Sequence, residues 1–510
     1  MELKECFKTA AETVKKLQYS ASLEGLLRYD QWTSLPEAGA AYRQELSAFL
    51  AERKAALFRD PSVQAAAREL SAVPPGEIGS VIQRGQVRIF LREFKKASRI
   101  QPETMRSFNM IRSEAVTAWR KARAARDYRI FEPWLKKAFD LKKQIALELN
   151  PDAPAFDTLV GMVDEGLTTA EISREFEVLR KSAAALLERI SASGRQPAAD
   201  FMQKDYGADA VMALGEKLAC ANGLDPRCVT FNGFGSHGLT NRPGPKDARI
   251  SLGKNGFIDL IFTLLHEGGH AMYAVRTAPE YADAGLWGGI SGAMQEGAAR
   301  FYENIVGRSR QFWQWHYGEL QAALPAFRDV SPAQFYAGIN AVRASLKRTA
   351  SDEVTYSLHI IIRYELERDY FEGKITAHDM AAAWNEKYRS VLGVTPADDL
   401  EGVLQDMHWT GDYIGYFQSY AVGNIYDGML RQKLLSDCPR AFERLADGDI
   451  SDIDSWMQKN IFDSGCAMTE PELMRHVCGG SLDARPFADY LNEKYAELYG
   501  LEMPASGRGA

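Results

Sequence analysis

One short stretch of the sequence has residue types and a spacing that suit metal chemistry: LLHEGGHAMY, from Leu264 to Tyr273. On a helix, residues four apart project from one face, so His266 and His270 can bind the same cation. Two imidazoles at this spacing are typical of Zn²⁺ sites. Glu267, beside the first histidine, can act as a general base towards water that the metal activates. The stretch therefore predicts a metal site with a catalytic base next to it.

The alternative interpretation is an ordinary helix with two surface histidines and a glutamate. Histidine is rare here, with eight in the chain, and the preceding segment GFIDLIFTLL is strongly apolar, which indicates a buried helix. A buried cluster of these groups needs a partner, and a cation provides one. Gly268 and Gly269 each cost about 1 kcal/mol relative to alanine inside a helix, which is understandable if another group approaches that backbone closely. These observations favour the metal site.

A catalytic zinc needs a third protein ligand and one open position. Glu296, thirty residues after His266 in SGAMQEGAARFYENIVGRS, is the best candidate by position. The alternative is a solvated ion pair between Glu296 and Arg300 at i,i+4. Glu303, two turns further on, is a competing ligand or a group that supports one. Periodicity alone does not choose between these readings.

The elements that must position these residues are predicted to be helices, at about 256–275 and 290–306. Only 20 prolines occur in 510 residues, and long segments show 3.6-residue periodicity, so we expect an all-α protein of some twenty helices. Arg249–Gly253 is one of the few short strand candidates. The segment Asn232–Lys246, NGFGSHGLTNRPGPK, is rich in glycine and proline and is predicted to be the longest loop.

Length and composition exclude several classes of protein. A chain of 510 residues exceeds the usual size of a single core, so two or more lobes are expected. The net charge of −7 gives no reason to expect a nucleic acid or an anionic membrane as partner. The six cysteines form no CxxC pair, the N-terminus has no signal-like apolar segment, and no apolar run is long enough to span a membrane. We expect a soluble, reduced, cytoplasmic protein.

Several further segments resemble motifs of one known family. The metal stretch HEGGHAMY is followed by QEGAARFYEN (Gln295–Asn304), similar to HESQSRxxEN, and preceded by SHGLTNRPGPKDARIS (Ser236–Ser251), similar to HPF and DxRxT. The others are LLRYDQWTSLPEAGAAYRQE (Leu26–Glu45), similar to WDxxTxMP; RTASDEVTYSLHIIIRYELE (Arg348–Glu367), similar to RVEADEVTY; GVLQDMHW (Gly402–Trp409), which matches GxxQDxHW; and GYFQSYAVGN (Gly415–Asn424), similar to GYFPSYxxGN. On these residues the chain resembles the carboxypeptidase Taq family of metallocarboxypeptidases over nearly its full length.

The resemblance implies an all-α, two-lobed helical fold with a deep central cleft, related to the neurolysin and angiotensin-converting-enzyme architecture. Residues 1–510 would form one metallocarboxypeptidase unit whose lobes flank the cleft, usually as a homodimer. The implied activity is removal of single C-terminal residues from peptides that have a free C-terminus, with Zn²⁺ or Co²⁺ as cofactor. The resemblance also makes Glu296 the third metal ligand, beside His266 and His270.

The resemblance gives roles to three residues that could contact substrate. A carboxypeptidase must hold a free carboxylate, which suits an arginine fork. Arg348 is the first choice, and Arg249 is the second, although Arg249 could instead form a structural pair with Asp247. His237 could contact the substrate or be an ordinary loop histidine.

A tetrahedral intermediate also needs a donor opposite the metal. His408, Tyr416 and Tyr420 come from an aromatic, glycine-punctuated segment suited to lining a cleft, and one of them should stabilise the oxyanion. The alternative is a packed aromatic corner. His359 lies within an apolar helix and is expected to be a core histidine.

The chain departs from the family pattern near its site. Gln295, Gly297 and Ala298 replace the family's histidine, serine and glutamine around Glu296. Gly238 and Leu239 stand in place of the proline and phenylalanine of HPF, Gln418 stands in place of the proline of GYFP, and Thr349–Ser351 replaces VEA. The ligands and base are intact, so the sequence predicts a divergent metallocarboxypeptidase with Glu267 as base. The alternatives are a neurolysin-like oligopeptidase or a catalytically weakened metal-binding homologue.

Overall fold

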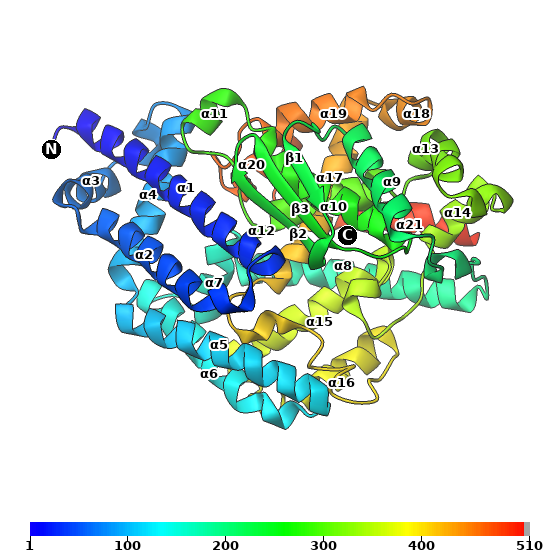
Figure 1. The fold of residues 1–510 in the computed structure, drawn as a ribbon, viewed down its shortest axis with the longest axis horizontal. Coiled ribbons are helices and arrows are strands. Elements are labelled where there is room, and N and C mark those ends of the chain that lie inside the picture. Colours follow the sequence, from blue (N-terminus) through cyan, green and yellow to red (C-terminus); the bar gives the residue numbers. More distant parts are fainter. Residues whose placement is uncertain (504–510) are drawn as a thin grey trace, which may run out of the picture.

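Helices dominate the structure, and they pack around one small sheet (Figure 1). The computed structural model describes residues 1–503, apart from the side chains of Ser236 and His237. None of the helices within residues 1–503 combines the length and the apolar composition that crossing a membrane requires. The predicted all-α class is confirmed. Helices lie at Asp259–Val275 and Gly292–Arg300, within the two segments where the metal-site helices were expected.

The helices of the N-terminal half are α1 (Leu3–Thr33), α2 (Ala40–Arg59), α3 (Pro61–Ser71), α4 (Val81–Arg99), α5 (Pro102–Ala125), α6 (Glu132–Leu149), α7 (Ala155–Val163), α8 (Thr169–Ala192) and α9 (Ala208–Ala221). Those that follow the sheet are α10 (Asp259–Val275), α11 (Pro279–Asp283), α12 (Gly292–Arg300), α13 (Arg310–Ala323), α14 (Pro332–Ile339), α15 (Glu353–Phe371), α16 (Met380–Leu392), α17 (Phe417–Asp437), α18 (Ala441–Ala446), α19 (Ser451–Met457), α20 (Glu470–Cys478) and α21 (Arg485–Tyr499). A π-helical segment, Phe301–Val306, continues α12.

The sheet lies between α1 and α10 and has the strand order β1-β3-β2 (Figure 1). Strands β1 (Val229–Asn232) and β3 (Asp247–Gly253) are parallel, whereas β2 (Phe234–Gly244) runs antiparallel to β3. The predicted strand at Arg249–Gly253 is confirmed and begins two residues earlier, at Asp247.

The prediction of a long loop at Asn232–Lys246 is wrong, because most of this segment is β2. Glycine and proline disfavour the interior of a sheet, but they are tolerated at edges and bulges. Strand β2 is an edge strand, and its register with β3 shifts between Phe234 and Leu239 and again between Asn241 and Gly244. The same residues that suggested a loop therefore fit an irregular edge strand.

Buried hydrophobic side chains form two clusters. The larger one runs from α5 to α21 and includes α10 and the sheet. The smaller one joins helices α1–α4, and it meets the rest of the chain through Ala284, Leu286 and Ala467. Helices α1–α4 accordingly lie together at one end of the molecule, where α1 packs along β2 (Figure 1).

Candidate metal centre

Two helices bring three potential metal ligands together. His266 and His270 lie on α10, and Glu296 lies on α12, which packs against α10. The ligand atoms of the three side chains are all within 4.8 Å of one another. His266 Nε2 lies 3.8 Å from Glu296 Oε2, and the two imidazole rings are perpendicular with centroids 4.8 Å apart. This is the donor set that the sequence predicts for a catalytic zinc.

The unpaired Glu296 oxygen and the neutral His270 imidazole are both suited to bind a cation. Glu296 is 6% exposed, and its Oε2 is buried without a hydrogen-bond partner, although a buried carboxylate oxygen normally has one. Burial lowers the pKa of His270 well below its ordinary value, so this imidazole is neutral and can offer a lone pair. A divalent cation would satisfy both groups at once.

Both imidazoles are held through Nδ1, which leaves each Nε2 to face the third ligand. His266 Nδ1 lies 3.0 Å from Glu303 Oε2, and His270 Nδ1 lies 3.1 Å from Gln295 Oε1. Gln295 is itself fixed, because its Nε2 donates to the backbone carbonyl of Gly288. Such outer hydrogen bonds set the tautomer and orientation of histidine ligands. Glu303 therefore supports a ligand here, which is one of the two roles that the sequence allowed.

The predicted base, Glu267, is buried beside the ligands with 6% of its surface exposed. Burial raises the pKa of its carboxyl group, while the charge of His266 and the hydrogen bond from Thr240 oppose that rise. Thr240 Oγ1 on β2 donates to Glu267 Oε2 at 2.5 Å. A Cβ atom at Gly238 would lie 2.5 Å from Glu267 Oε1, so glycine, where the family has proline, leaves room for this carboxylate.

Close contact between α10 and α12 explains one of the two motif glycines. A Cβ atom on Gly269 would lie 2.6 Å from both the carbonyl oxygen of Ala298 and the Cα of Ala299. On Gly268 the nearest atoms would be at ordinary contact distances, 3.6 Å and 3.7 Å. The expected close approach of another backbone is therefore present at Gly269 and absent at Gly268.

Aromatic residues of α17 and of the segment before it cover another side of the site. Tyr416 Oη donates to Glu296 Oε1 at 3.1 Å, while Tyr420 Oη lies 3.1 Å from His408 Nε2. Burial raises the pKa of both tyrosines well above 10, and the Glu296 carboxylate adds to the rise, so both remain hydroxyl donors. Burial lowers the pKa of His408 to about 3, which keeps this imidazole neutral. Tyr416 is thus the one of these three that touches a ligand directly.

The predicted substrate-binding residues lie in different surroundings. Arg348 Nε and Nη2 donate to Asp406 Oδ1 at 3.1 Å and 2.8 Å, and its guanidinium lies over the Tyr420 ring. Arg249 forms a two-point pair with Asp247, at 3.1 Å and 2.9 Å, as the alternative interpretation expected. The side chain of His237 lies outside the described residues.

Two of the residues that depart from the family pattern form hydrogen bonds at or near the site. Gln295, in place of histidine, accepts a hydrogen bond from His270 Nδ1 through its Oε1. Gln418, in place of proline, donates through Nε2 to Asp164 Oδ2 at 2.9 Å, and Asp164 Oδ1 accepts the backbone N–H of Ala293 at 2.8 Å. Through Asp164, Gln418 is therefore joined to the first turn of the helix that carries Glu296.

His359 is fully buried against Tyr388, as expected for a core histidine.

Sequence reasoning missed Thr240 and Arg242. Both lie on β2, two residues apart. The glycines and prolines around them suggested a loop, so nothing in the sequence placed them at the site. Arg242 lines a cavity of about 470 Å³ together with Thr240, residues of α1 and α4, and the segment Trp287–Ile290.

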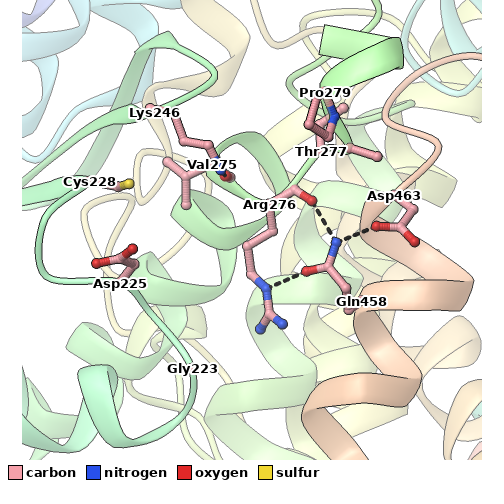
Figure 2. A pocket seen from close by; sticks show the side chains of 11 residues that line it. Gly223, Asp225, Cys228, Lys246, Val275, Arg276, Thr277, Pro279, Gln458 and Asp463 are labelled. Atoms are coloured by element: carbon pink, nitrogen blue, oxygen red, sulfur yellow. Dashed lines mark hydrogen bonds between the residues drawn. The ribbon is translucent and has the colours of Figure 1, made fainter.

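A second cavity, of about 340 Å³, lies at the C-terminal end of α10, and its polar groups are already paired (Figure 2). Arg276 Nε donates to Gln458 Oε1 at 2.7 Å, and Gln458 Nε2 donates to the Arg276 carbonyl and to Asp463. Lys246 Nζ donates to the Val275 carbonyl at 2.8 Å. None of the predicted site residues lines this cavity, so we assign it no ligand.

Comparison with known proteins gives matches along almost the whole chain. The sequence model of the carboxypeptidase Taq (M32) metallopeptidases matches residues 9–495. Thermostable carboxypeptidase 1 of Thermus thermophilus is 32% identical over 505 residues, which cover 97% of this chain and 99% of that protein. Carboxypeptidase 1 of Bacillus subtilis is 29% identical over 515 residues, covering 98% of this chain and all of that protein. The crystal structure of an M32 carboxypeptidase from Deinococcus radiodurans superposes with a TM-score of 0.91 at 31% identity, covering 97% of this chain and 99% of that one.

Proposed function

Because the chain belongs to the carboxypeptidase Taq (M32) family of metallopeptidases, we propose that it removes single residues from the free C-terminus of peptides. The family supports a metal-dependent carboxypeptidase that acts on peptides. The narrower proposal concerns the mechanism, the metal and the residues that carry each step.

The observation that carries the proposal is the convergence of His266, His270 and Glu296, with the buried Glu296 Oε2 lacking any other partner. We propose that these three residues hold Zn²⁺, with Co²⁺ as an alternative. A divalent cation bound there would supply Lewis-acid chemistry, which makes water a better nucleophile and polarises the scissile carbonyl.

The protein's own residues would move the protons. Glu267 accepts a proton from the attacking water and passes it to the departing amine, as a general base and then a general acid. Thr240 holds one oxygen of this carboxylate and so fixes its orientation. Because Glu267 is next to His266 on the helix, the base remains beside the ligand set.

Hydroxyl groups would stabilise the charge that develops on the carbonyl oxygen. Tyr416 is the favoured donor, because its hydroxyl already reaches the ligand set through Glu296. Tyr420 and His408 are joined by a hydrogen bond and remain candidates as a pair. Release of a terminal residue further requires a cation for the substrate carboxylate, and the resemblance makes Arg348 the first candidate and Arg249 the second.

The competing function is a neurolysin-like oligopeptidase that cuts within short peptides. Mass spectrometry of one peptide, as the free acid and as its C-terminal amide, separates the two. We expect stepwise loss of C-terminal residues from the free acid, no trimming of the amide, and no reaction after chelation of the metal. Internal fragments formed equally from both peptides would support the oligopeptidase instead.

A non-catalytic metal-binding homologue is the third possibility. The variant Glu267→Gln should keep its metal and lose peptide hydrolysis by about 10²- to 10⁴-fold, the usual contribution of a general base. Unchanged hydrolysis would remove Glu267 from the mechanism. No hydrolysis by the unmodified protein would favour the non-catalytic homologue.

From the family resemblance we also expect a homodimer in the cytoplasm. Size-exclusion chromatography with light scattering would test the dimer, and cell fractionation would test the location.

A further inference from the structure

Arg242 is an arginine beside the metal centre that has no acceptor for its charge. Its Nη1 is buried and has no hydrogen-bond partner. A buried guanidinium nitrogen normally has a partner, so an unpaired one beside a catalytic site indicates a ligand that the site is built to receive. Arg363, which is fully buried, pairs with Asp406, whereas Arg242 has no such carboxylate partner among the described residues.

Arg242 shares a cavity with a residue that contacts the proposed base. Thr240 and Arg242 are two residues apart on β2, and both line the cavity of about 470 Å³. Thr240 also contacts Glu267, so the cavity that Arg242 lines reaches a residue that holds the proposed base. Strand β2 is also the edge of the sheet, where an extended peptide can lie alongside it.

Arg242 lines the same cavity as Thr240, whose hydroxyl donates to the Glu267 carboxylate. Burial lowers the pKa of Arg242, and the charges of Tyr416, Glu267 and Glu296 oppose that effect. When a divalent cation is bound by Glu296, that carboxylate no longer balances the guanidinium. The arginine then lies beside a second positive charge, and an incoming anion would be attracted to both.

The other two candidate arginines are each paired with an aspartate. Arg348 shares Asp406 with Arg363, whose Nε donates to Asp406 Oδ2 at 2.6 Å. Asp406 therefore lies between two guanidinium groups, and these ion pairs join the segment around Asp406 to Arg348 and to Arg363 of α15. Arg249 pairs with Asp247 on its own strand. Of the three, only Arg242 has a buried Nη1 without a partner.

We propose that Arg242 binds the C-terminal carboxylate of the peptide substrate. This assignment rests on the proposed carboxypeptidase function and names the residue that confers its exopeptidase specificity. The planar guanidinium can hold a carboxylate through two parallel hydrogen bonds, which a lysine cannot reproduce. The cavity of about 470 Å³ that Arg242 lines lies on the side of α1 and α4 and provides room for the terminal residue.

The test measures binding, so it does not depend on turnover. In the Glu267→Gln background, a peptide is titrated as the free acid and as the amide, with and without Arg242→Gln. We expect Arg242→Gln to weaken binding of the free acid by about 10- to 100-fold and to change binding of the amide little, as for the loss of a charge-assisted hydrogen bond. Arg242→Lys, which keeps the charge, should recover only part of the loss.

Two further variants control for other effects. Arg227→Gln removes an arginine whose side chain is 87% exposed and pairs with Asp225, so it should leave both affinities unchanged. Arg348→Gln tests whether Arg348, and not Arg242, binds the C-terminal carboxylate. If Arg242→Gln and Arg242→Lys keep the full preference for the free acid, and Arg348→Gln loses it, the assignment to Arg242 is overturned.

Failure of this assignment is distinguishable from failure of the proposed function. C-terminal trimming by the unmodified protein, together with an unchanged acid preference in Arg242→Gln, would contradict only the role of Arg242. Internal cleavage of acid and amide peptides at equal rates would contradict the carboxypeptidase function, and with it the role of Arg242.

Discussion

The two histidine ligands differ in the group that orients each ring. Glu303 gives His266 a carboxylate partner, whereas Gln295 gives His270 a neutral amide oxygen. The carboxylates of Glu303 and Glu296 outweigh the effect of burial and raise the pKa of His266, while His270 stays neutral. The amide of Gln295 is also anchored to Gly288, so its oxygen cannot rotate away without breaking that hydrogen bond.

Removing this anchor should weaken metal binding. We expect Gln295→Leu to raise the dissociation constant for Zn²⁺ by about 10- to 100-fold, the usual effect of losing an outer partner of a histidine ligand. Gln295→Glu retains an acceptor for His270 and should bind more tightly than Gln295→Leu. Competition with a fluorescent chelator measures all three proteins, and exposed Gln203→Leu is the control. Equal affinities for Gln295→Leu and the unmodified protein would show that Gln295 does not orient the ligand.

At the scale of single residues, the sequence predicted the features that depend only on local spacing. The i,i+4 spacing of His266 and His270 is fixed by the helix, so it could be predicted without knowing the tertiary structure. The position of Arg242 depends on strand pairing with β3 and on packing against α10. These contacts are made by residues distant in sequence, and no spacing rule reveals them.

At the scale of elements, the site depends on how closely α12 approaches α10. Gly269 permits that approach, because any Cβ there would overlap the backbone of α12. We expect Gly269→Ala to displace α12, to lower the free energy of unfolding by about 1–3 kcal/mol, as overpacking does, and to weaken metal binding. Urea unfolding and metal titration measure the two effects.

Gly268→Ala is the matched control on the same helix. The added methyl group would meet only ordinary contacts, and alanine favours the helix by about 1 kcal/mol over glycine. Gly268→Ala should therefore be neutral or stabilising and bind metal normally. Equal losses in both variants would show that the contact between Gly269 and α12 does not explain the requirement for glycine.

Helix α15 holds the aromatic segment that carries His408 and Tyr416. Glu367 on α15 is fully buried, and its two oxygens accept Trp409 Nε1 at 2.8 Å and the backbone N–H of Gly415 at 3.1 Å. Burial raises the pKa of this carboxyl group to about 8. Its folded pKa is above its unfolded value, so its contribution to stability is greatest below about pH 4.5 and is lost as the pH rises through about 8.

Glu367→Gln removes this titration and leaves the other groups in place. We expect the melting temperature of the unmodified protein, relative to Glu367→Gln, to fall between about pH 4.5 and 8 and to level off above that range. Differential scanning calorimetry across pH measures the difference. A constant difference over this range would mean that Glu367 titrates alike in the folded and unfolded chain.

The helices were predicted from the sequence, whereas strand β2 was not. The helices follow from apolar periodicity. In the structure, Asp352 accepts from Val354 N and caps α15. Strand β2 was taken for a loop because glycine and proline dominate its composition. Its strand conformation is imposed by pairing with β3, a tertiary effect that composition does not contain.

At the scale of the whole molecule, the cluster formed by α1–α4 joins the larger core through few residues. Helix α4 touches Ala467 where Gly85 has no side chain, and a Cβ there would lie 2.7 Å from the Ala467 carbonyl oxygen. Since this cluster also borders the cavity beside Arg242, its attachment influences one wall of the proposed substrate site. The sequence predicted lobes from chain length, but it gave no indication of which residues join them.

We expect Gly85→Ala to lower the melting temperature and to raise hydrogen exchange in residues 1–100, because α4 must move away from Ala467. Gly161→Ala on α7 is the control, since a methyl group there would meet nothing within 4 Å. That variant should be unchanged or slightly stabilised. If Gly85→Ala exchanges like the unmodified protein, the contact does not hold the two clusters together.

The central claim is that one catalytic cation is held by His266, His270 and Glu296. Metal content and affinity, measured by elemental analysis and chelator competition on the unmodified protein and on Glu296→Gln, test it most directly. The account predicts one tightly bound divalent cation per chain, with binding weakened by orders of magnitude in Glu296→Gln while the helical fold is retained. Full metal content and unchanged affinity in Glu296→Gln would contradict it.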